Sequence, residues 1–256
     1  MSDSLFDLTG KTAIITGSTK GIGRAIAFRM AQHGANVVVS SRKADACEAV
    51  TAEINAADYP GSAISMPCNI GYKDQLQALV DKTVTELGPI DILVCNAAIN
   101  PFAGPMIDIP DDAFDKIMAS NIRSNHWLCG MVLPSMKARK QGSITIVSSI
   151  GGLRGSEILG AYAISKAADM QMARNIAVEY GPFNVRANAI APGLVRTDFA
   201  RYLWENEDIL RSATAGSALR RIGEPDEIAG AAVFLASKAG AFTTGQTIVC
   251  DGGATI

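Results

Sequence analysis

A tyrosine and a lysine stand four positions apart in the segment AYAISKAADM, residues 161–170, which is otherwise mostly small and apolar. Residues at this spacing share one face of a helix, so Tyr162 and Lys166 can project into the same cleft. A free tyrosine loses its proton only near pKa ~10, and a nearby ammonium favours the charged phenolate. The pair could therefore move a proton near neutral pH. An isolated pair of this kind is more often exposed on an amphipathic helix, so the functional interpretation needs partners.

Two further polar residues are candidates for the same site. Ser149 follows the β-branched run SITIVS, and a hydroxyl at the carboxyl end of a parallel strand can hydrogen-bond a substrate oxygen. Asn121 falls inside an expected helix, where asparagine is unfavourable unless it has a role or lies on the surface. With these two residues present, we favour catalysis for Tyr162 and Lys166.

A glycine-rich segment, TGSTKGIG at 16–23, lies between the first expected strand and the first expected helix. Glycines there permit a tight turn and let backbone amides approach a pyrophosphate at a helix N-terminus. An ordinary strand-to-helix turn explains some such matches, but the position after the first strand favours a dinucleotide site. The residues expected to contact the dinucleotide are Gly17, Ser18, Thr19, Lys20, Gly21, Ile22 and Gly23.

Short β-branched runs alternate with longer helical patterns along the chain. The runs predict strands at 12–16, 36–40, 62–66, 90–95, 143–148, 185–190 and 246–250. Helices are predicted at 21–33, 44–57, 72–87, 110–138, 156–180 and 225–236, several followed by a glycine that should end them. Right-handed crossovers then require a parallel sheet with helices on both faces. We expect one α/β domain over residues 1–256, a Rossmann-like doubly wound sheet of about seven strands.

The composition narrows the class of partner. The 256 residues carry a net charge of −2, which indicates neither nucleic acid nor an anionic membrane, so small molecules are the expected ligands. No stretch reaches the ~18 apolar residues needed to span a bilayer. The five cysteines are odd in number and scattered, as expected for reduced thiols in a cytoplasmic protein. Neither His33 nor His126 has a partner at metal-binding spacing, so no metal is expected.

The spacing Gly-x-x-x-Gly-x-Gly resembles that of the short-chain dehydrogenase/reductase family. CNAAI, at 95–99, resembles the family's Asn-Asn-Ala-Gly motif, with Cys95 and Ala98 as departures and Asn96 and Ala97 as matches. Further motifs follow in the family's order along nearly the whole chain: SNI at 120–122, IVSSIGG at 146–152, YAISK at 162–166 and APGLVRT at 191–197.

This resemblance implies a role for each member of the catalytic set. Tyr162 would donate a proton to a carbonyl oxygen during reduction and accept one during oxidation. Lys166 would also hold the nicotinamide ribose, Ser149 would polarise the substrate oxygen, and Asn121 would anchor a water that links Lys166 to solvent. Hydride would come from the cofactor, so no nucleophile is required. Other implied cofactor contacts are Asn69 and Ile70, where the family often has Asp in place of Asn69, and Asn96, Ala97, Pro192, Gly193, Val195 and Thr197.

The segment after the second expected strand, VVVSSRK at 37–43, lacks the acid that usually binds the adenosine ribose in NAD enzymes. Ser40 and Ser41 can donate to a phosphate, Arg42 can form a charge-assisted fork, and Lys20 could approach from the glycine turn. We therefore expect NADP(H) as the cofactor. The alternative is that these basic side chains are merely solvated.

Closer similarity is to the NADPH-dependent carbonyl reductases of the peroxisomal dehydrogenase/reductase subgroup. It lies in NAAINPFAG at 96–104, SSRK at 40–43 and APGLVRTDFARYLW at 191–204. The chain departs from the subgroup at its end, because GGATI has no Ser-Lys-Leu type peroxisomal address. We therefore expect a cytoplasmic location.

The segment 194–224 resembles the substrate lid of the family and holds several aromatic residues. They would form an apolar wall suited to an apolar or aromatic carbonyl, unless they merely pack a short helix. Arg154 could recognise an anionic group or be a solvated loop residue. The expected substrate contacts are Ser149, Tyr162, Phe102, Leu203 and Trp204.

Together these features predict an NADP-dependent oxidoreductase that interconverts a carbonyl and a secondary alcohol. By resemblance it would be a homotetramer with the helices at 110–138 and 156–180 at an interface. A 3-oxoacyl-thioester reductase, acting on acyl carrier protein or CoA substrates, is an alternative with the same site. A non-catalytic dinucleotide sensor is a third possibility, against which the complete catalytic set argues.

Overall fold

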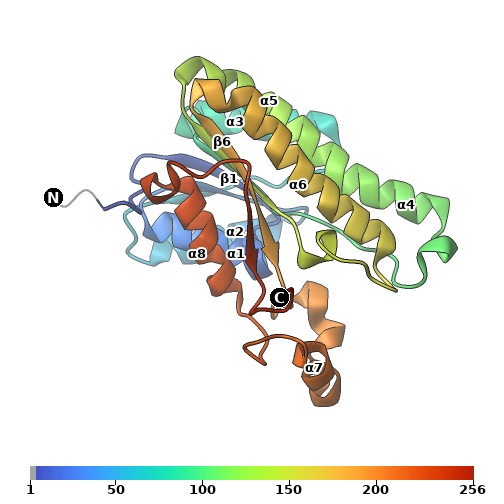
Figure 1. Cartoon of the computed structure of the whole chain (residues 1–256). Coiled ribbons are helices and arrows are strands. Elements are labelled where there is room, and N and C mark those ends of the chain that lie inside the picture. Colours follow the sequence, from blue (N-terminus) through green and yellow to red (C-terminus); the bar gives the residue numbers. More distant parts are fainter. Residues whose placement is uncertain (1–3) are drawn as a thin grey trace.

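Seven parallel strands form a single sheet in the computed structural model, which describes residues 4–256. Their order is β3-β2-β1-β4-β5-β6-β7 (Figure 1). The chain therefore begins with an inner strand, β1, and adds later strands on both sides of it. The strands are β1 (Thr12–Thr16), β2 (Asn36–Ser40), β3 (Ala63–Ser65), β4 (Ile92–Cys95), β5 (Gly142–Val147), β6 (Val185–Pro192) and β7 (Thr247–Cys250). The predicted single-domain Rossmann fold is confirmed.

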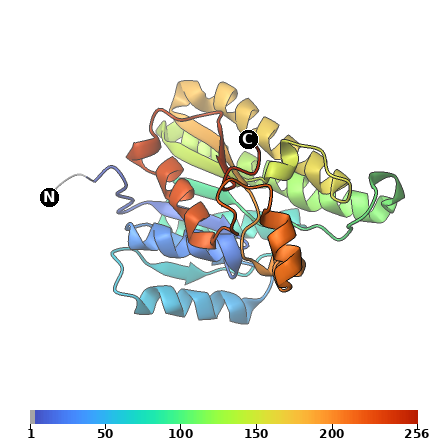
Figure 2. The ribbon, with the colours of Figure 1, turned by 60° about the horizontal axis from the view of Figure 1, so that its bottom comes forward.

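Helices cover both faces of the sheet, each over its own buried apolar cluster. One face carries α1 (Gly21–Gln32), α2 (Ala44–Ala56) and α8 (Pro225–Ala236). The other carries α3 (Lys73–Leu87), α5 (Ser124–Arg139) and α6 (Gly160–Tyr180), as Figures 1 and 2 show. The central strands are buried on both faces, which is why their sequences are continuously apolar instead of alternating.

The helix predicted at 110–138 is not continuous. It consists of α4 (Asp111–Met118), a π-helical turn (Ala119–Arg123) and α5. The interruption falls on Asn121, and π turns of this kind frequently occur at functional sites. The helix predicted at 156–180 begins later, at Gly160, and ends at Tyr180 before Gly181, as predicted.

The carboxyl ends of the strands are covered by short elements of the chain. The predicted lid contains a 3-10 segment (Asp198–Leu203) and α7 (Glu207–Thr214), and a 3-10 turn (Ile150–Gly152) follows β5. The remaining 3-10 turns are Met106–Asp108, Gly181–Phe183 and Lys238–Gly240. None of the helices formed by residues 4–256 is long and apolar enough to cross a lipid bilayer.

Candidate active site

The glycine turn between β1 and α1 is shaped by close backbone contacts. Gly17 has a φ of +67°, a conformation that favours glycine. A Cβ on Gly23 would lie 2.4 Å from both the Gly17 carbonyl oxygen and Asn96 Nδ2, so a larger residue cannot fit. Asn96 Nδ2 in turn donates to the carbonyls of Thr16 and Gly17, at 2.9 and 3.2 Å. The loop after β4 therefore holds the glycine turn in place.

The N-terminus of α1 is suited to an anion. Among the described residues no side chain caps its first turn, and that turn contains no acidic residue. Its free N–H groups and the helix dipole can therefore bind a pyrophosphate. Ser18 does not share this role, because its hydroxyl donates to Ile15 O at 2.8 Å and accepts from Ser40 N at 2.9 Å. Ser18 supports the turn from inside, contrary to the expectation that it contacts the dinucleotide.

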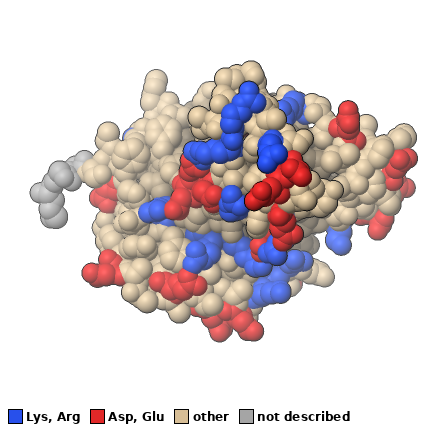
Figure 3. Space-filling model, turned by 90° about the horizontal axis from the view of Figure 1, so that it is seen from below, with Lys and Arg blue, Asp and Glu red and all other residues tan. Residues whose placement is uncertain are grey.

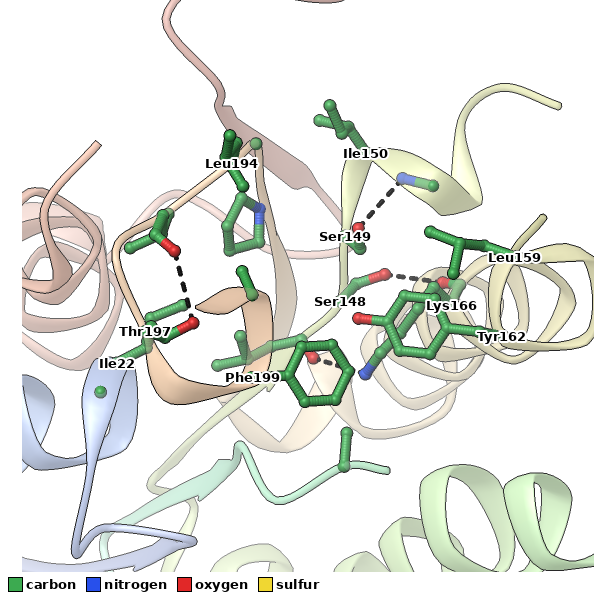
Figure 4. A pocket seen from close by; sticks show the side chains of 18 of the residues that line it. Ile22, Ser148, Ser149, Ile150, Leu159, Tyr162, Lys166, Leu194, Thr197 and Phe199 are labelled. Atoms are coloured by element: carbon green, nitrogen blue, oxygen red, sulfur yellow. Dashed lines mark hydrogen bonds between the residues drawn. The ribbon is translucent and has the colours of Figure 1, made fainter. Parts of the chain in front are cut away.

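A cavity of about 910 Å³ lies at the carboxyl edge of the sheet, between the glycine turn, the end of β5, α6 and the lid (Figure 4). Its dimensions suit a nicotinamide dinucleotide together with a small substrate. The predicted site residues that line it are Gly17, Lys20, Gly21, Ile22, Gly23, Asn96, Ala97, Ser149, Tyr162, Lys166, Pro192, Gly193, Val195, Thr197 and Leu203.

The hydroxyl groups of Tyr162 and Ser149 face this cavity from two different elements (Figure 4). Tyr162 comes from the first turn of α6, and Ser149 directly follows β5. Ser149 Oγ accepts a hydrogen bond from Gly151 N at 3.0 Å, which leaves its proton available for a ligand oxygen. Phe199 of the lid covers the Tyr162 ring, with 5.8 Å between the ring centroids. The two hydroxyls are thus both available to a ligand in this cavity.

Lys166 is the largest fully buried side chain of the described structure. Its ammonium donates to Val147 O and to Asp169 Oδ2, both at 2.9 Å, and lies 5.7 Å from the centre of the Tyr162 ring. Burial acts to lower the pKa of Lys166, but the nearby Asp169 carboxylate and Tyr162 phenol outweigh it, so the net shift is upward. The ammonium therefore keeps its charge beside Tyr162.

Asn121 is fully buried and does not line the cavity. Its side chain accepts from Ile99 N at 2.9 Å and donates to Ile99 O at 3.0 Å and to Ser165 Oγ at 3.1 Å. These bonds tie the π turn to the loop after β4 and to α6. Asn121 thus positions the elements that carry Asn96 and Tyr162.

The residues predicted at the adenosine end lie outside the lining of the cavity. Cys68 N donates to Ser41 O at 2.9 Å, so the loops after β2 and β3 lie side by side and bring Arg42 near Asn69. Arg42 is exposed. Asn69 Oδ1 accepts from Gly71 N at 3.1 Å and so shapes its own turn. The predicted residues not among the lining of the cavity are Ser18, Thr19, Ser41, Arg42, Asn69, Ile70, Phe102, Asn121 and Trp204.

Lys20 does not extend freely toward the adenosine end. Its ammonium forms an ion pair with Asp198 Oδ2 of the lid at 2.7 Å, and Asp198 also accepts from Arg201. Hydrogen bonds from Lys20 and Arg201 lower the pKa of Asp198 to about 2. The ion pair with Asp198 therefore links the glycine turn to the lid. On the face seen from below in Figure 3, basic and acidic side chains are interspersed.

The lid is a loop with paired ends and a partly apolar inner side. Arg196 N donates to Gly223 O and Gly223 N to Leu194 O, which closes it at its base. Trp204, predicted to contact substrate, instead donates from Nε1 to Thr197 O at 2.9 Å and packs within the lid. Phe102 also lies outside the lining. The lid side chains that line the cavity are Leu194, Val195, Thr197, Asp198, Phe199, Ala200, Leu203 and Ala213.

Residues 17–255 match the model of a protein family described as "Enoyl-(Acyl carrier protein) reductase". The chain is also 42% identical to "Dehydrogenase/reductase SDR family member 4" of Bos taurus over 96% of its own length and 88% of the relative's. The chain belongs to the short-chain dehydrogenase/reductase family. It is therefore an oxidoreductase that uses a nicotinamide dinucleotide and acts on a small molecule at a CH–OH or C=O group.

Two solved structures show how closely the fold is shared. A 7α-hydroxysteroid dehydrogenase complexed with NADH and 7-oxo glycochenodeoxycholic acid has a TM-score of 0.93 and 36% identity, covering 99% of this chain and 97% of that one. A gluconate 5-dehydrogenase from Burkholderia cenocepacia, in complex with NADP and tartrate, has a TM-score of 0.92 and 29% identity, covering 98% and 97%. Similar backbones thus accompany either cofactor and different substrates, so the choice must lie in side chains.

Asp169 and Asn125 are buried polar residues beside the site that reasoning from motifs did not identify. Asp169 accepts from Lys166 and from Asn125. A signal was present, because both are polar residues at positions that the helical pattern places toward the core.

Proposed function

We propose that the chain is an NADP-dependent oxidoreductase that interconverts a carbonyl and a secondary alcohol, with Tyr162 as its acid and base. The observation that carries the proposal is the convergence of the Tyr162 and Ser149 hydroxyls on one cavity, with the buried Lys166 ammonium beside the Tyr162 ring. A sensor that only bound a dinucleotide would need no such arrangement. An enzyme that transfers a proton to a carbonyl oxygen requires it.

The nicotinamide cofactor, when bound, supplies or accepts a hydride at the substrate carbon. Ser149 donates a hydrogen bond from its hydroxyl to the substrate oxygen and so stabilises the negative charge that develops there. Tyr162 delivers the proton that completes the alcohol, and takes it back in the reverse reaction. Lys166 stabilises the tyrosine anion electrostatically. Phe199 and Leu203 shield this end of the cavity from solvent and favour an apolar or aromatic substituent on the substrate.

The proposal of NADP rests on the adenosine end. Arg42 is exposed next to the loop of Asn69, and the segment from 40 to 43 contains no carboxylate that would repel a 2′-phosphate. Ser41 lies beside it. Lys20 could reach the phosphate as well, but it would first have to leave Asp198. We therefore assign the main phosphate contact to Arg42 and a secondary one to Lys20.

Substrate class separates this proposal from its nearest alternative. A 3-oxoacyl-thioester reductase would use the same four residues, and the description of the matching family model names acyl carrier protein. The test is NADPH oxidation with a panel of aryl and alkyl ketones, diketones and a 3-oxoacyl thioester. We expect turnover with the apolar ketones. Turnover restricted to the thioester would favour the alternative, and cofactor binding without any turnover would favour a sensor.

We also propose a homotetramer in the cytoplasm. Apolar side chains are exposed on the two helices that would form the interface, with Phe114 on α4 and Ile164 and Val178 on α6. Val178 is 82% exposed in the single chain, and covering it with another subunit would bury apolar surface and stabilise an assembly. All five cysteines are free thiols, as in a reducing compartment. Sedimentation equilibrium would test the tetramer.

A further inference from the structure

A buried carboxylate touches the ammonium that the site depends on. Asp169 lies one helical turn after Lys166 on α6, and its side chain has no solvent exposure. Asp169 Oδ2 accepts from Lys166 Nζ at 2.9 Å, and Asp169 Oδ1 accepts from Asn125 Nδ2 of α5 at 3.1 Å. Both carboxylate oxygens are thus used. A carboxylate is costly to bury, so a fully paired one at this position points to a specific use.

Asn125 extends this contact to the π turn. Its Nδ2 also donates to the carbonyl oxygen of Asn121 at 2.7 Å. Side chains thus connect Lys166 to Asn121 continuously, through Asp169 and Asn125. The π turn, α5 and α6 are held in register by this network.

The network restricts the orientation of Lys166. An ammonium has three N–H donors, and Val147 O and Asp169 take two of them. One donor remains for the cavity. The same carboxylate offsets part of the positive charge that Lys166 presents to Tyr162, whose ring centre is 5.7 Å from Nζ. Less positive charge near a phenol makes its ionised form less favourable.

We propose that Asp169 is a positioning residue that aims Lys166 and offsets part of its charge, so that Tyr162 keeps its proton up to a higher pH than it would beside an unpaired lysine. This inference rests on the function proposed above. In reduction Tyr162 must hold a proton to give, whereas in oxidation it must first lose one. A carboxylate behind the lysine therefore extends the pH range over which Tyr162 can donate its proton to a carbonyl oxygen.

Other titratable groups face the same cluster. Cys95 at the end of β4 and Cys129 of α5 are both buried, and a hydrogen bond with Cys129, together with burial, raises the pKa of Cys95 well above its usual range. The Cys95 thiol is therefore neutral at physiological pH. Burial raises the pKa of Asp169, while Lys166 and Asn125 act to lower it. The buried charged groups next to Tyr162 on α6 are Lys166 and Asp169, while Lys20, Arg154 and Asp198 also line the cavity.

Asp169→Asn tests the proposal directly, because asparagine keeps the shape and removes the charge. The phenol of Tyr162 is followed by NMR in protein labelled with ¹³Cζ-tyrosine, and Tyr162→Phe identifies its signal among the five tyrosines. We expect the titration midpoint of this phenol to fall by about one pH unit in Asp169→Asn. In Asp169→Glu, which keeps the negative charge, the midpoint should lie close to that of the unchanged protein. Asp226→Asn, which removes an exposed carboxylate paired with Arg29, should leave it unchanged.

The pH dependence of carbonyl reduction provides a second readout. In Asp169→Asn the fall of kcat at alkaline pH should begin about one pH unit lower than in the unchanged protein. A folded Asp169→Asn protein whose Tyr162 midpoint moves by less than about 0.3 unit would overturn the proposal. The NMR result needs no substrate. A shifted midpoint in a protein that reduces no ketone would therefore support the charge effect while contradicting the proposed function.

If Asp169→Asn does not fold, the pair can be removed as a unit in Lys166→Met/Asp169→Leu, because buried ion pairs can often be replaced by apolar residues. Because Asp169 offsets only part of the Lys166 charge, the proposal predicts that the Tyr162 midpoint then rises by less than about one unit relative to the unchanged protein. A rise of more than about one unit would mean that Lys166 acts with its full charge, and would overturn the proposal.

Discussion

The two ends of the cofactor cleft are built differently. At the catalytic end Lys166, Asp169, Asn121 and Asn125 are buried and joined by hydrogen bonds that cross from α6 to α5 and the π turn. At the adenosine end Arg42 is exposed at the surface. In the proposed function, the geometry of proton transfer is therefore built into the core, whereas the choice of cofactor would depend on a few surface side chains. Substitutions at the first end should change the rate, and those at the second should change which ligand binds.

Tyr162→Phe should produce the largest effect, because it removes the transferable proton while keeping the ring that packs against Phe199. We expect kcat to fall by roughly 10²- to 10⁴-fold. The dissociation constant for NADPH, measured by fluorescence titration, should change little. Near-normal turnover in this variant would mean that another group delivers the proton.

Arg42→Asp should have an intermediate effect and act on binding. It removes one attractive charge and adds a repulsive one, so NADPH affinity should weaken by roughly 30- to 1000-fold. NADH affinity should stay the same or improve, because NADH has no 2′-phosphate. Lys20→Ala is the matched comparison, with a smaller loss, since Lys20 is already paired with Asp198. An equal loss for both cofactors in Arg42→Asp would indicate a general structural role.

Substitutions in the lid should have the smallest of the three effects, and two aromatic residues of the lid, Phe199 and Trp204, can be compared. Phe199 lines the cavity over Tyr162, whereas Trp204 packs inside the lid through Thr197. Phe199→Ala should raise KM for bulky aromatic ketones about 10-fold while changing KM for small ketones less. Trp204→Ala should affect both classes equally and modestly. A larger rise in KM for bulky than for small ketones in Trp204→Ala would indicate that the Trp204 ring contacts the substrate.

The sequence was sufficient to predict the order of strands and helices, because buried runs and helical patterns alternate without a break. The motifs also predicted a catalytic set, of which Ser149, Tyr162 and Lys166 line one cavity, and the roles of these residues stay predictions. The π turn at Asn121 was not predictable, because the apolar periodicity continues across it. Asp169 was missed because its partners, Lys166 and Asn125, lie on two different helices. Such pairing depends on tertiary packing, which a motif does not describe.

The contacts of the lid were also not predictable from sequence motifs. Its aromatic content indicated a wall, but the 3-10 geometry of Asp198–Leu203 turns Phe199 toward the cavity and leaves Trp204 outside its lining. The pair of Lys20 with Asp198 joins residues 178 positions apart, which no local pattern reveals.

The central claim is that the chain reduces carbonyls with NADPH, and the most direct test is kcat/KM of the unchanged protein for NADPH and for NADH with the best ketone of the panel. We predict a preference for NADPH of at least about 10-fold, which corresponds to the contribution of one good charged contact. Equal values, or a preference for NADH, would contradict the assignment of the cofactor.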